Sequence, residues 1–320
     1  MTEGPGLYVH VPFCSAKCGY CDFYSLAAPR LMPGWLEAIR REISAYRLEY
    51  NCFETLYVGG GTPSHLPEDH LAELFGALGA WPLAGPAEVT LEVNPEDVTP
   101  GKIKRVLDLG VNRISLGIQS LDDRALRVLS RRHSVSDAIR AARTIRSAGC
   151  RNLGLDLIYG LPGQDLADWL SILERALELA PDHLSCYQLT LEPGTRYQKM
   201  ADQGCLRLPD EETARAMFLA TSSLLEDRGF EHYEVSNFAR SREKRSRHNQ
   251  KYWRHVPYLG LGPSAHSYQK NVRWWNVRSI RGYSRALAAG HRPVAESETL
   301  SDDQIRLEAV SYTHLTLPTN

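Results

Sequence analysis

The sequence predicts an α/β fold: an open, partial barrel of six strand–helix units, followed by a smaller accessory region. Short β-type runs alternate with amphipathic segments up to about Pro209, where the alternation stops. Repeated strand–helix units form parallel sheets with right-handed crossovers. Six units are too few to close an eight-unit barrel. A doubly wound sandwich is the alternative architecture.

The six expected strands fall at regular intervals before Pro209. They cover Leu7–Val11, Thr55–Val58, Glu88–Val93, Arg113–Gly117, Leu153–Ile158 and Leu184–Leu189. Between the first two strands, Trp35, Ile39 and Ile43 recur at helical spacing. Thr99 followed by Pro100 is typical of a helix start, with an N-cap residue and a first-turn proline.

The region after Pro209 has a different pattern. A long helix is expected from Pro209 to Arg228, a Gly/Tyr/Trp-rich stretch covers Phe230–Asn276, and a second helix covers Ile280–Ala289. We expect the accessory region to be truncated, because the last ten residues of the sequence break from the preceding pattern. The predicted parts are a core domain at residues 6–208, a truncated accessory region at 209–310 and a non-native tail at 311–320.

Composition narrows the class of protein. The chain has 320 residues, 43% hydrophobic and 23% charged, which is ordinary for a folded protein with a sizeable core. A net charge of −1 argues against a protein that coats nucleic acid. No signal peptide and no apolar run of about 18 residues is present. Seven cysteines, an odd number without secretory context, argue against a disulfide framework. We therefore expect a cytoplasmic protein without a transmembrane segment.

Three cysteines, Cys14, Cys18 and Cys21, form a C-x3-C-x2-C motif after the first strand. A four-iron cluster held by three thiolates keeps one iron open for another ligand. A zinc site completed by His10 and a chance cluster of thiols are the alternatives. Structural zinc usually needs a second cysteine pair, and the sequence has none. The motif therefore favours a 4Fe–4S cluster.

Polar residues stand at the ends of the otherwise apolar strands, where barrels of this class have their active sites. They are Glu92, Gln119, Asp156 and Gln188, with a glycine run at Gly59–Ser64. Alone, Gln119 could start a helix and Asp156 could pair with a buried arginine. The run has neither the lysine of a phosphate loop nor G-x-G-x-x-G spacing. Together these residues indicate a pocket for a small zwitterion, such as an amino acid group.

From about Leu7 to about Val310 the sequence resembles radical S-adenosylmethionine (SAM) proteins of the oxygen-independent coproporphyrinogen III oxidase family. The matching strings are the cysteine motif, Gly59–Pro63, Glu92–Pro95, Gly117–Ser120, Asp156–Gly163 and Tyr187–Leu189. The resemblance implies a partial (β/α)6 radical-SAM barrel with a 4Fe–4S cluster and bound SAM. The SAM contacts that it implies are Tyr8, Gly60, Gly61, Thr62, Glu92, Gln119, Arg131 and Asp156.

The implied roles suit the chemistry of these side chains. Glu92 can accept hydrogen bonds from the methionyl amine, and Asp156 or Gln119 from hydroxyl groups. Arg131 can bind the carboxylate, with its neighbour Arg132 as the alternative. Hydrogen bonds of this charge-assisted kind each contribute about 1.5–3 kcal/mol.

Two features separate this chain from the oxidases of that family. The oxidase is expected to have a further cysteine two positions after the third, where this chain has Phe23. It is also expected to have a long segment before its first cysteine, whereas only 13 residues precede Cys14. The sequence therefore resembles the heme-chaperone branch of the family more closely.

The accessory region contains His-Asn-x-x-Tyr-Trp, which resembles a motif associated with heme binding in that branch. The resemblance implies that His248 is an axial heme ligand and that Tyr252 and Trp253 present flat faces. His255 and His266 are rival ligands. The nearby basic residues suit two propionates: Arg240, Arg242, Lys244, Arg245, Arg247, Lys251 and Arg254.

The expected function is that of a heme chaperone that binds heme and transfers it to acceptor proteins, with the membrane surface as one place of transfer. The first alternative is oxidative decarboxylation of coproporphyrinogen III. The second is a radical enzyme that modifies RNA, with the basic stretch at 240–254 contacting phosphates. Near-neutral total charge counts against the RNA alternative.

Overall fold

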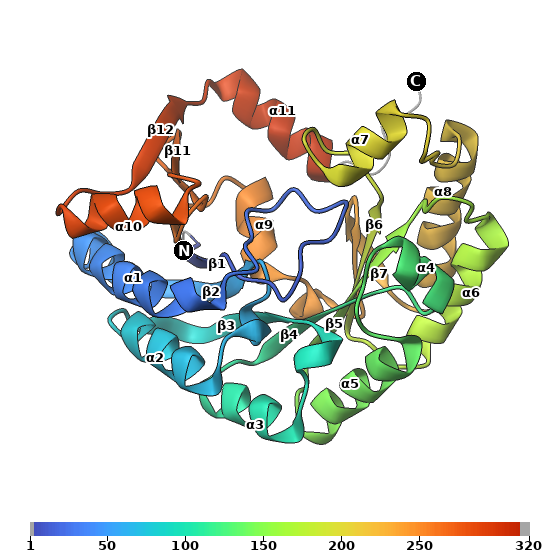
Figure 1. Ribbon diagram of the computed structural model, residues 1–320, viewed down its shortest axis with the longest axis horizontal. Coiled ribbons are helices and arrows are strands. Elements are labelled where there is room, and N and C mark those ends of the chain that lie inside the picture. The colour runs from blue at the N-terminus through green and yellow to red at the C-terminus, as the bar shows by residue number, and fades with distance from the viewer. Residues whose placement is uncertain (1–2, 314–320) are drawn as a thin grey trace.

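The computed structural model describes residues 3–313, with side chains described up to residue 309. Its centre is a curved sheet in which six parallel strands pair in chain order. Figure 1 shows helices along the convex side of these strands and the loop after β1 on the concave side. The six strands are β1 (Gly6–Val11), β2 (Phe53–Gly60), β3 (Leu83–Val93), β4 (Arg113–Gln119), β5 (Leu153–Tyr159) and β6 (His183–Gln188).

All six predicted strands are present and pair in parallel, and the predicted α/β fold is confirmed. The largest boundary difference is in β3, which begins at Leu83 rather than Glu88. The doubly wound alternative is wrong, because such a sheet reverses its strand order at a switch point. Here the order runs from β1 to β6 without reversal.

The helices between the strands pack their apolar sides against the sheet. Trp35, Ile39 and Ile43 of α1 are buried, as their spacing predicts. At the start of α3, the Thr99 side chain accepts a hydrogen bond from the backbone N–H of Lys102. These helices are α1 (Met32–Tyr46), α2 (Glu68–Leu78), α3 (Pro100–Asp108), α4 (Asp123–Val128), α5 (Val135–Ser147) and α6 (Leu166–Leu177), with 3-10 turns at Pro29–Leu31, Pro63–His65 and Pro95–Asp97.

The residues after β6 extend the same sheet at both edges. Strand β9 pairs in parallel with β1, and β8 pairs antiparallel with β6. The full strand order is β12-β11-β10-β9-β1-β2-β3-β4-β5-β6-β8-β7. The added strands are β7 (Glu231–Glu234), β8 (Asn237–Ala239), β9 (Tyr258–Leu261), β10 (His266–Gln269), β11 (Val272–Asn276) and β12 (Val294–Thr299).

The two helices expected after Pro209 are present as α8 (Glu211–Asp227) and α10 (Ile280–Ala288). The remaining elements of this part are α7 (Arg196–Asp202), a 3-10 turn at Arg242–Lys244, α9 (Arg247–Trp253) and α11 (Asp302–Thr313). The division at 208/209 stays a prediction. Of the predicted tail, 311–313 continue α11 and 314–320 lie outside the described residues. Within residues 3–313, no helix is long and apolar enough to cross a membrane.

Candidate cofactor site

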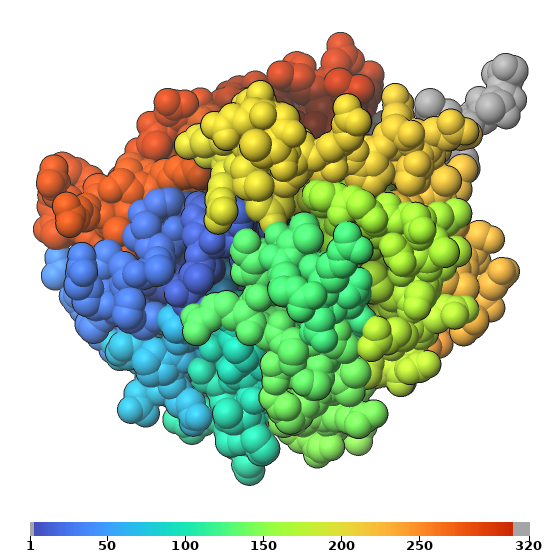
Figure 2. All heavy atoms as spheres, turned by 45° about the vertical axis from the view of Figure 1, so that its right-hand side comes forward, coloured from blue at the N-terminus to red at the C-terminus, as the bar shows by residue number. Residues whose placement is uncertain are grey.

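The cysteine loop follows β1 at the carboxyl end of the parallel strands. A β-bridge between Phe13 and Leu26 closes its base, where the Cys14 N–H donates to the Leu26 carbonyl (3.2 Å). Cys14, Cys18 and Cys21 are all half-buried free thiols. In Figure 2 this blue segment lies between the yellow residues around α7 and the green residues after β4. On the α7 side, the Tyr197 N–H donates to the Gly19 carbonyl (3.0 Å).

The three thiols are close enough to influence one another. Burial, together with the neighbouring Cys18 and Cys14, raises the pKa of Cys21 to about 11. Within the described part of the chain, no three His, Cys, Asp or Glu side chains converge on a point that one metal ion could occupy. Thiols that are adjacent but not convergent fit a cubane, since each thiolate there binds a different iron.

Hydrogen-bond donors reach two of the cysteine sulfurs. The Thr62 hydroxyl donates to the Cys14 Sγ (3.4 Å), and the Arg131 Nη1 donates to the Cys18 Sγ (3.7 Å). Asn94 connects the two donors, because its Nδ2 donates to the Thr62 Oγ1 (3.1 Å) and its Oδ1 accepts from the Arg131 Nη2 (2.7 Å). Such donors stabilise negative charge on sulfur, as iron-bound thiolates require.

The glycine run after β2 packs against the base of the cysteine loop. Gly60 has a φ of +108°, and a Cβ there would lie 2.5 Å from the His10 ring. A Cβ on Gly61 would lie 2.7 Å from the Phe13 carbonyl oxygen. Glycine is therefore required here because the run packs directly against the cysteine loop. The sequence alone does not show this packing.

Two carboxylates line the inside of the barrel. Glu92 accepts hydrogen bonds from the Tyr57 hydroxyl (2.8 Å) and the Gly60 N–H (3.0 Å). Burial, together with the Asp156 charge, raises the pKa of Glu92 to about 7. Asp156 accepts from the Ser115 hydroxyl (3.0 Å). Neither carboxylate forms an ion pair with a described residue, although the charge of the buried Arg113 lowers the pKa of both.

The other predicted SAM contacts lie beside these groups. The Tyr8 hydroxyl lies 3.1 Å from the His10 Nδ1 inside the barrel. Gln119 ends β4 with a φ of 62°, a strained conformation typical of functional sites. Arg131 also donates to the Gly117 carbonyl (3.0 Å), but its Nε is buried and has no described hydrogen-bond partner. An acceptor such as the SAM carboxylate would satisfy that nitrogen.

Comparison with known proteins shows to which family the chain belongs. The Radical SAM superfamily model matches residues 8–176. The heme chaperone HemW of Mycobacterium tuberculosis is 38% identical over 312 residues, which cover 95% of this chain and 80% of the relative. HemW of Bacillus subtilis is 33% identical over 307 residues, covering 94% and 81%. The chain belongs to the HemW branch of the radical SAM superfamily.

Two further comparisons give another radical SAM relative and a solved structure of similar fold. The mitochondrial radical S-adenosyl methionine domain-containing protein 1 of Mus musculus is 39% identical over 264 residues, covering 81% of this chain and 60% of the relative. The solved structure of Escherichia coli coproporphyrinogen III oxidase (HemN), a radical SAM enzyme, superposes with a TM-score of 0.83. That match covers 96% of this chain and 75% of HemN, and at 23% identity it shows the fold alone.

Membership of the HemW branch gives the cysteine loop its chemical context, because the radical SAM superfamily implies a 4Fe–4S cluster and SAM. The described residues fit both groups: three adjacent thiols for the cluster, and for SAM two carboxylates that accept hydrogen bonds inside the barrel and the unpartnered Arg131 Nε. The individual contacts of Tyr8, Gly60 and the other predicted SAM residues stay predictions.

Both ring nitrogens of His248 have partners within the protein, and the heme-ligand role that the motif implies for it stays a prediction. His248 is fully buried, its Nδ1 lies 2.8 Å from the Thr55 Oγ1, and its Nε2 lies 2.8 Å from the Tyr252 hydroxyl. Thr55 is near the beginning of β2, so α9 closes the end of the barrel opposite the cysteine loop. Both ring nitrogens are used in holding that closure together.

Sequence reasoning missed Tyr57 and Asn94, although each contacts a predicted site residue. Tyr57 donates to Glu92, and Asn94 joins Thr62 to Arg131. A usable signal was available for Asn94, because it lies two positions after Glu92 and residues two apart in an extended chain share a face. Tyr57 could have been found in the same way, because it lies two positions before Gly59 in the same strand.

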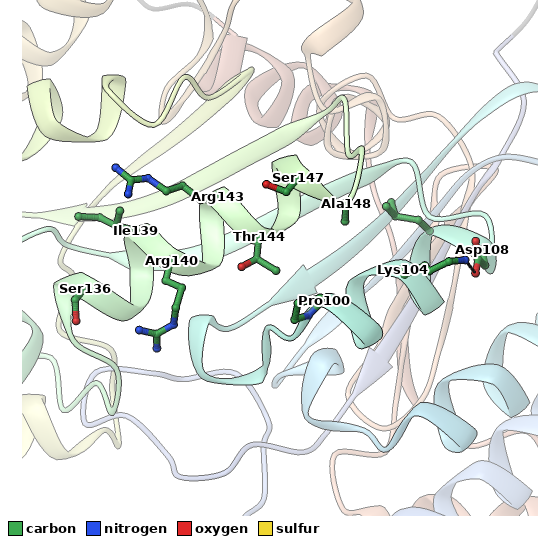
Figure 3. Close-up of a pocket in the computed structure, with 11 residues that line it drawn as sticks. Pro100, Lys104, Asp108, Ser136, Ile139, Arg140, Arg143, Thr144, Ser147 and Ala148 are labelled. Atoms are coloured by element: carbon green, nitrogen blue, oxygen red, sulfur yellow. Dashed lines mark hydrogen bonds and ion pairs between the residues drawn. The ribbon is translucent and has the colours of Figure 1, made fainter.

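A separate groove of about 870 Å³ lies outside the barrel, between α3 and α5. Figure 3 shows Lys104 and Asp108 on one of its walls and Arg140 and Arg143 on the other. None of the cysteines or predicted SAM contacts lines this groove. It is therefore no part of the cofactor site.

Proposed function

We propose that this chain is a heme chaperone of the HemW type, which binds heme and transfers it to acceptor proteins in the cytoplasm or at the membrane surface. Similarity to HemW proteins over most of the chain is the observation that carries the proposal. The structure adds a second reason. Phe23, which stands where the oxidase is expected to have a further cysteine, points outward with 65% of its surface exposed.

The chain's own residues would hold the cofactors in separate ways. Cys14, Cys18 and Cys21 would bind the cluster, which in radical SAM proteins supplies the electron for SAM cleavage. Glu92 would accept a hydrogen bond from the amine of SAM, and Arg131 would donate one to its carboxylate. Thr62 and Arg131 also stabilise charge on two of the cysteine sulfurs.

The testing experiment uses anaerobically reconstituted protein and titrates heme and SAM into the same sample. A heme chaperone should bind heme stoichiometrically and release it to an excess of a heme-free acceptor such as apomyoglobin. With coproporphyrinogen III, reductant and SAM, it should form no protoporphyrinogen. Clear turnover would identify an oxidase instead, and absence of heme binding would refute the proposal. Strong binding to RNA that falls steeply with salt would favour the RNA-modifying alternative.

A further inference from the structure

The rim of the sheet beside the cysteine loop presents a histidine that no described contact uses. Strand β9 runs parallel to β1, and β10 returns antiparallel to β9. The first residue of β10, His266, is therefore at the same end of the sheet as the cysteine loop. Trp275 of β11 is its direct cross-strand partner.

His266 differs from the other candidate ligands in its free nitrogens. His266 is exposed, and no described residue forms a hydrogen bond or ion pair with its ring. His10 and His248 have both ring nitrogens in contact with polar partners. The His255 Nε2 lies 3.3 Å from the Glu308 carboxylate, and this side chain is only 11% exposed.

The ring of His266 is also held flat and neutral. It stacks on Trp275 with 5.5 Å between ring centroids and 27° between the planes. Partial burial lowers the pKa of His266, and the Arg273 charge lowers it further. A neutral imidazole in a fixed orientation is the form that binds iron.

Two more residues, at the cysteine loop and after β11, have the chemistry of a heme surface. Phe23 is an aromatic ring left largely in solvent by the outer part of the cysteine loop. Arg278, three residues after Trp275, donates to the Asp22 carbonyl (2.9 Å) and keeps 59% of its side chain exposed. Arg278 and His266 are both near enough to His10 to lower its pKa electrostatically.

We propose that heme binds at this rim, with His266 as the axial ligand of its iron. Trp275 and Phe23 would contact the apolar macrocycle, and Arg278 would pair with a propionate. The proposal rests on the proposed function and names the place where the cargo would sit. It puts the heme at the cluster end of the barrel rather than at the end closed by α9.

The first test titrates heme into wild-type protein and the variant His266→Ala, following the Soret band. We expect at least a tenfold weaker Kd and a shifted band, because the axial nitrogen is lost. His291→Ala is the matched control, since His291 is also an exposed histidine of the accessory region. An unchanged Kd and Soret band in His266→Ala would overturn the rim site. Heme binding by the wild-type protein would still support the proposed function in that case.

A second variant separates ligation from general damage to the rim. In His266→Gly, free imidazole should restore the wild-type Soret band and low-spin EPR signal, because it can occupy the vacated ligand position. Phe23→Ala should weaken heme binding severalfold with the band unchanged, whereas Leu48→Ala, at a residue 96% exposed elsewhere, should change neither. If imidazole does not restore the band in His266→Gly, and if only His248→Ala removes the band, the axial ligand is His248 of α9 and the rim proposal is wrong. Failure of the wild-type protein to bind heme would instead refute the proposed function.

Discussion

Arg131 shows how one side chain can serve both a cluster and the ligand beside it. Its Nη1 reaches the Cys18 sulfur, its Nη2 is fixed by Asn94 and Gly117, and its Nε has no described partner. The sequence predicts only the contact with a carboxylate. The contact with sulfur depends on how the side chain crosses from the loop after α4 to the cysteine loop.

Replacing Arg131 should therefore change the cluster itself. In Arg131→Gln, a cationic donor to a thiolate is lost, and the more negative reduced cluster loses more stabilisation than the oxidised one. We expect the midpoint potential to fall by on the order of 50 mV. An EPR redox titration measures this. Arg132→Gln, at the exposed neighbour, should leave the potential unchanged; equal potentials in all three proteins would contradict the sulfur contact.

The sequence predicts much of the site at this scale and misses its supporting contacts. The cysteines, Glu92 and Asp156 are recognisable because polar residues at the ends of apolar strands must face a shared rim. The strained backbone of Gln119 and the contact of Arg131 with the Cys18 sulfur cannot be recognised from the sequence. Both depend on the register shift between β4 and β5 and on neighbours distant in the chain.

Helix α9 shows how a sequence motif can be structural. Its basic side chains have partners within the protein: the Lys251 Nζ donates to the Glu54 carboxylate (3.1 Å), and the Arg247 Nη1 donates to the Pro86 carbonyl (2.7 Å). Lys251 is buried. The number of basic residues in the sequence does not show that their side chains have partners. Residues 240–254 therefore present a less open cationic surface than the sequence suggests.

Removing the His248 ring should weaken the fold. His248→Ala leaves the Thr55 and Tyr252 hydroxyls without their buried partner and opens a cavity beneath Tyr57. We expect a loss of about 2–4 kcal/mol in the free energy of unfolding, measured by urea denaturation, with His291→Ala as the exposed control. The folded fraction should keep its heme spectrum. A wild-type unfolding midpoint combined with a lost heme band would show that His248 is a ligand after all.

At the scale of the whole molecule, one buried carboxyl group joins the barrel to the accessory strands. Glu42 of α1 accepts hydrogen bonds from the Gly262 N–H (2.8 Å), the Asn276 Nδ2 (2.6 Å) and the Tyr283 hydroxyl (2.5 Å). Burial raises the pKa of Glu42 to about 7, against hydrogen bonds that lower it. The folded protein therefore retains a proton here that the unfolded chain has lost above about pH 4.5.

This raised pKa makes stability depend on pH in a known direction. Because the folded state binds the proton more tightly, stability should fall as pH rises from about 4.5 to 7 and level off above that. In Glu42→Gln the fall between pH 5 and pH 8 should be smaller by about 2 kcal/mol. Urea unfolding at the two pH values measures it, and the raised pKa of Glu92 remains in both proteins. An identical fall in both would show that Glu42 does not titrate in this range.

The accessory strands mark the limit of what the sequence predicts about the fold. The six core strands are apolar runs with clear helices between them, so local patterns suffice. The segments Tyr258–Leu261 and Val272–Asn276 are short, and their placement depends on pairing with β1 and with one another. Such pairing between distant parts of the chain leaves no local pattern.

The position of β1 between β2 and β9 has a consequence for biosynthesis. The strand that leads into the cysteine loop is made first, yet one of its two edges is covered only by Tyr258–Leu261. On the ribosome, the cysteines emerge long before this edge is paired, and contacts so far apart in sequence form slowly. The iron-binding loop thus acquires its finished surroundings only after Tyr258–Leu261 has been synthesised, which places cluster insertion after synthesis of the first accessory strands.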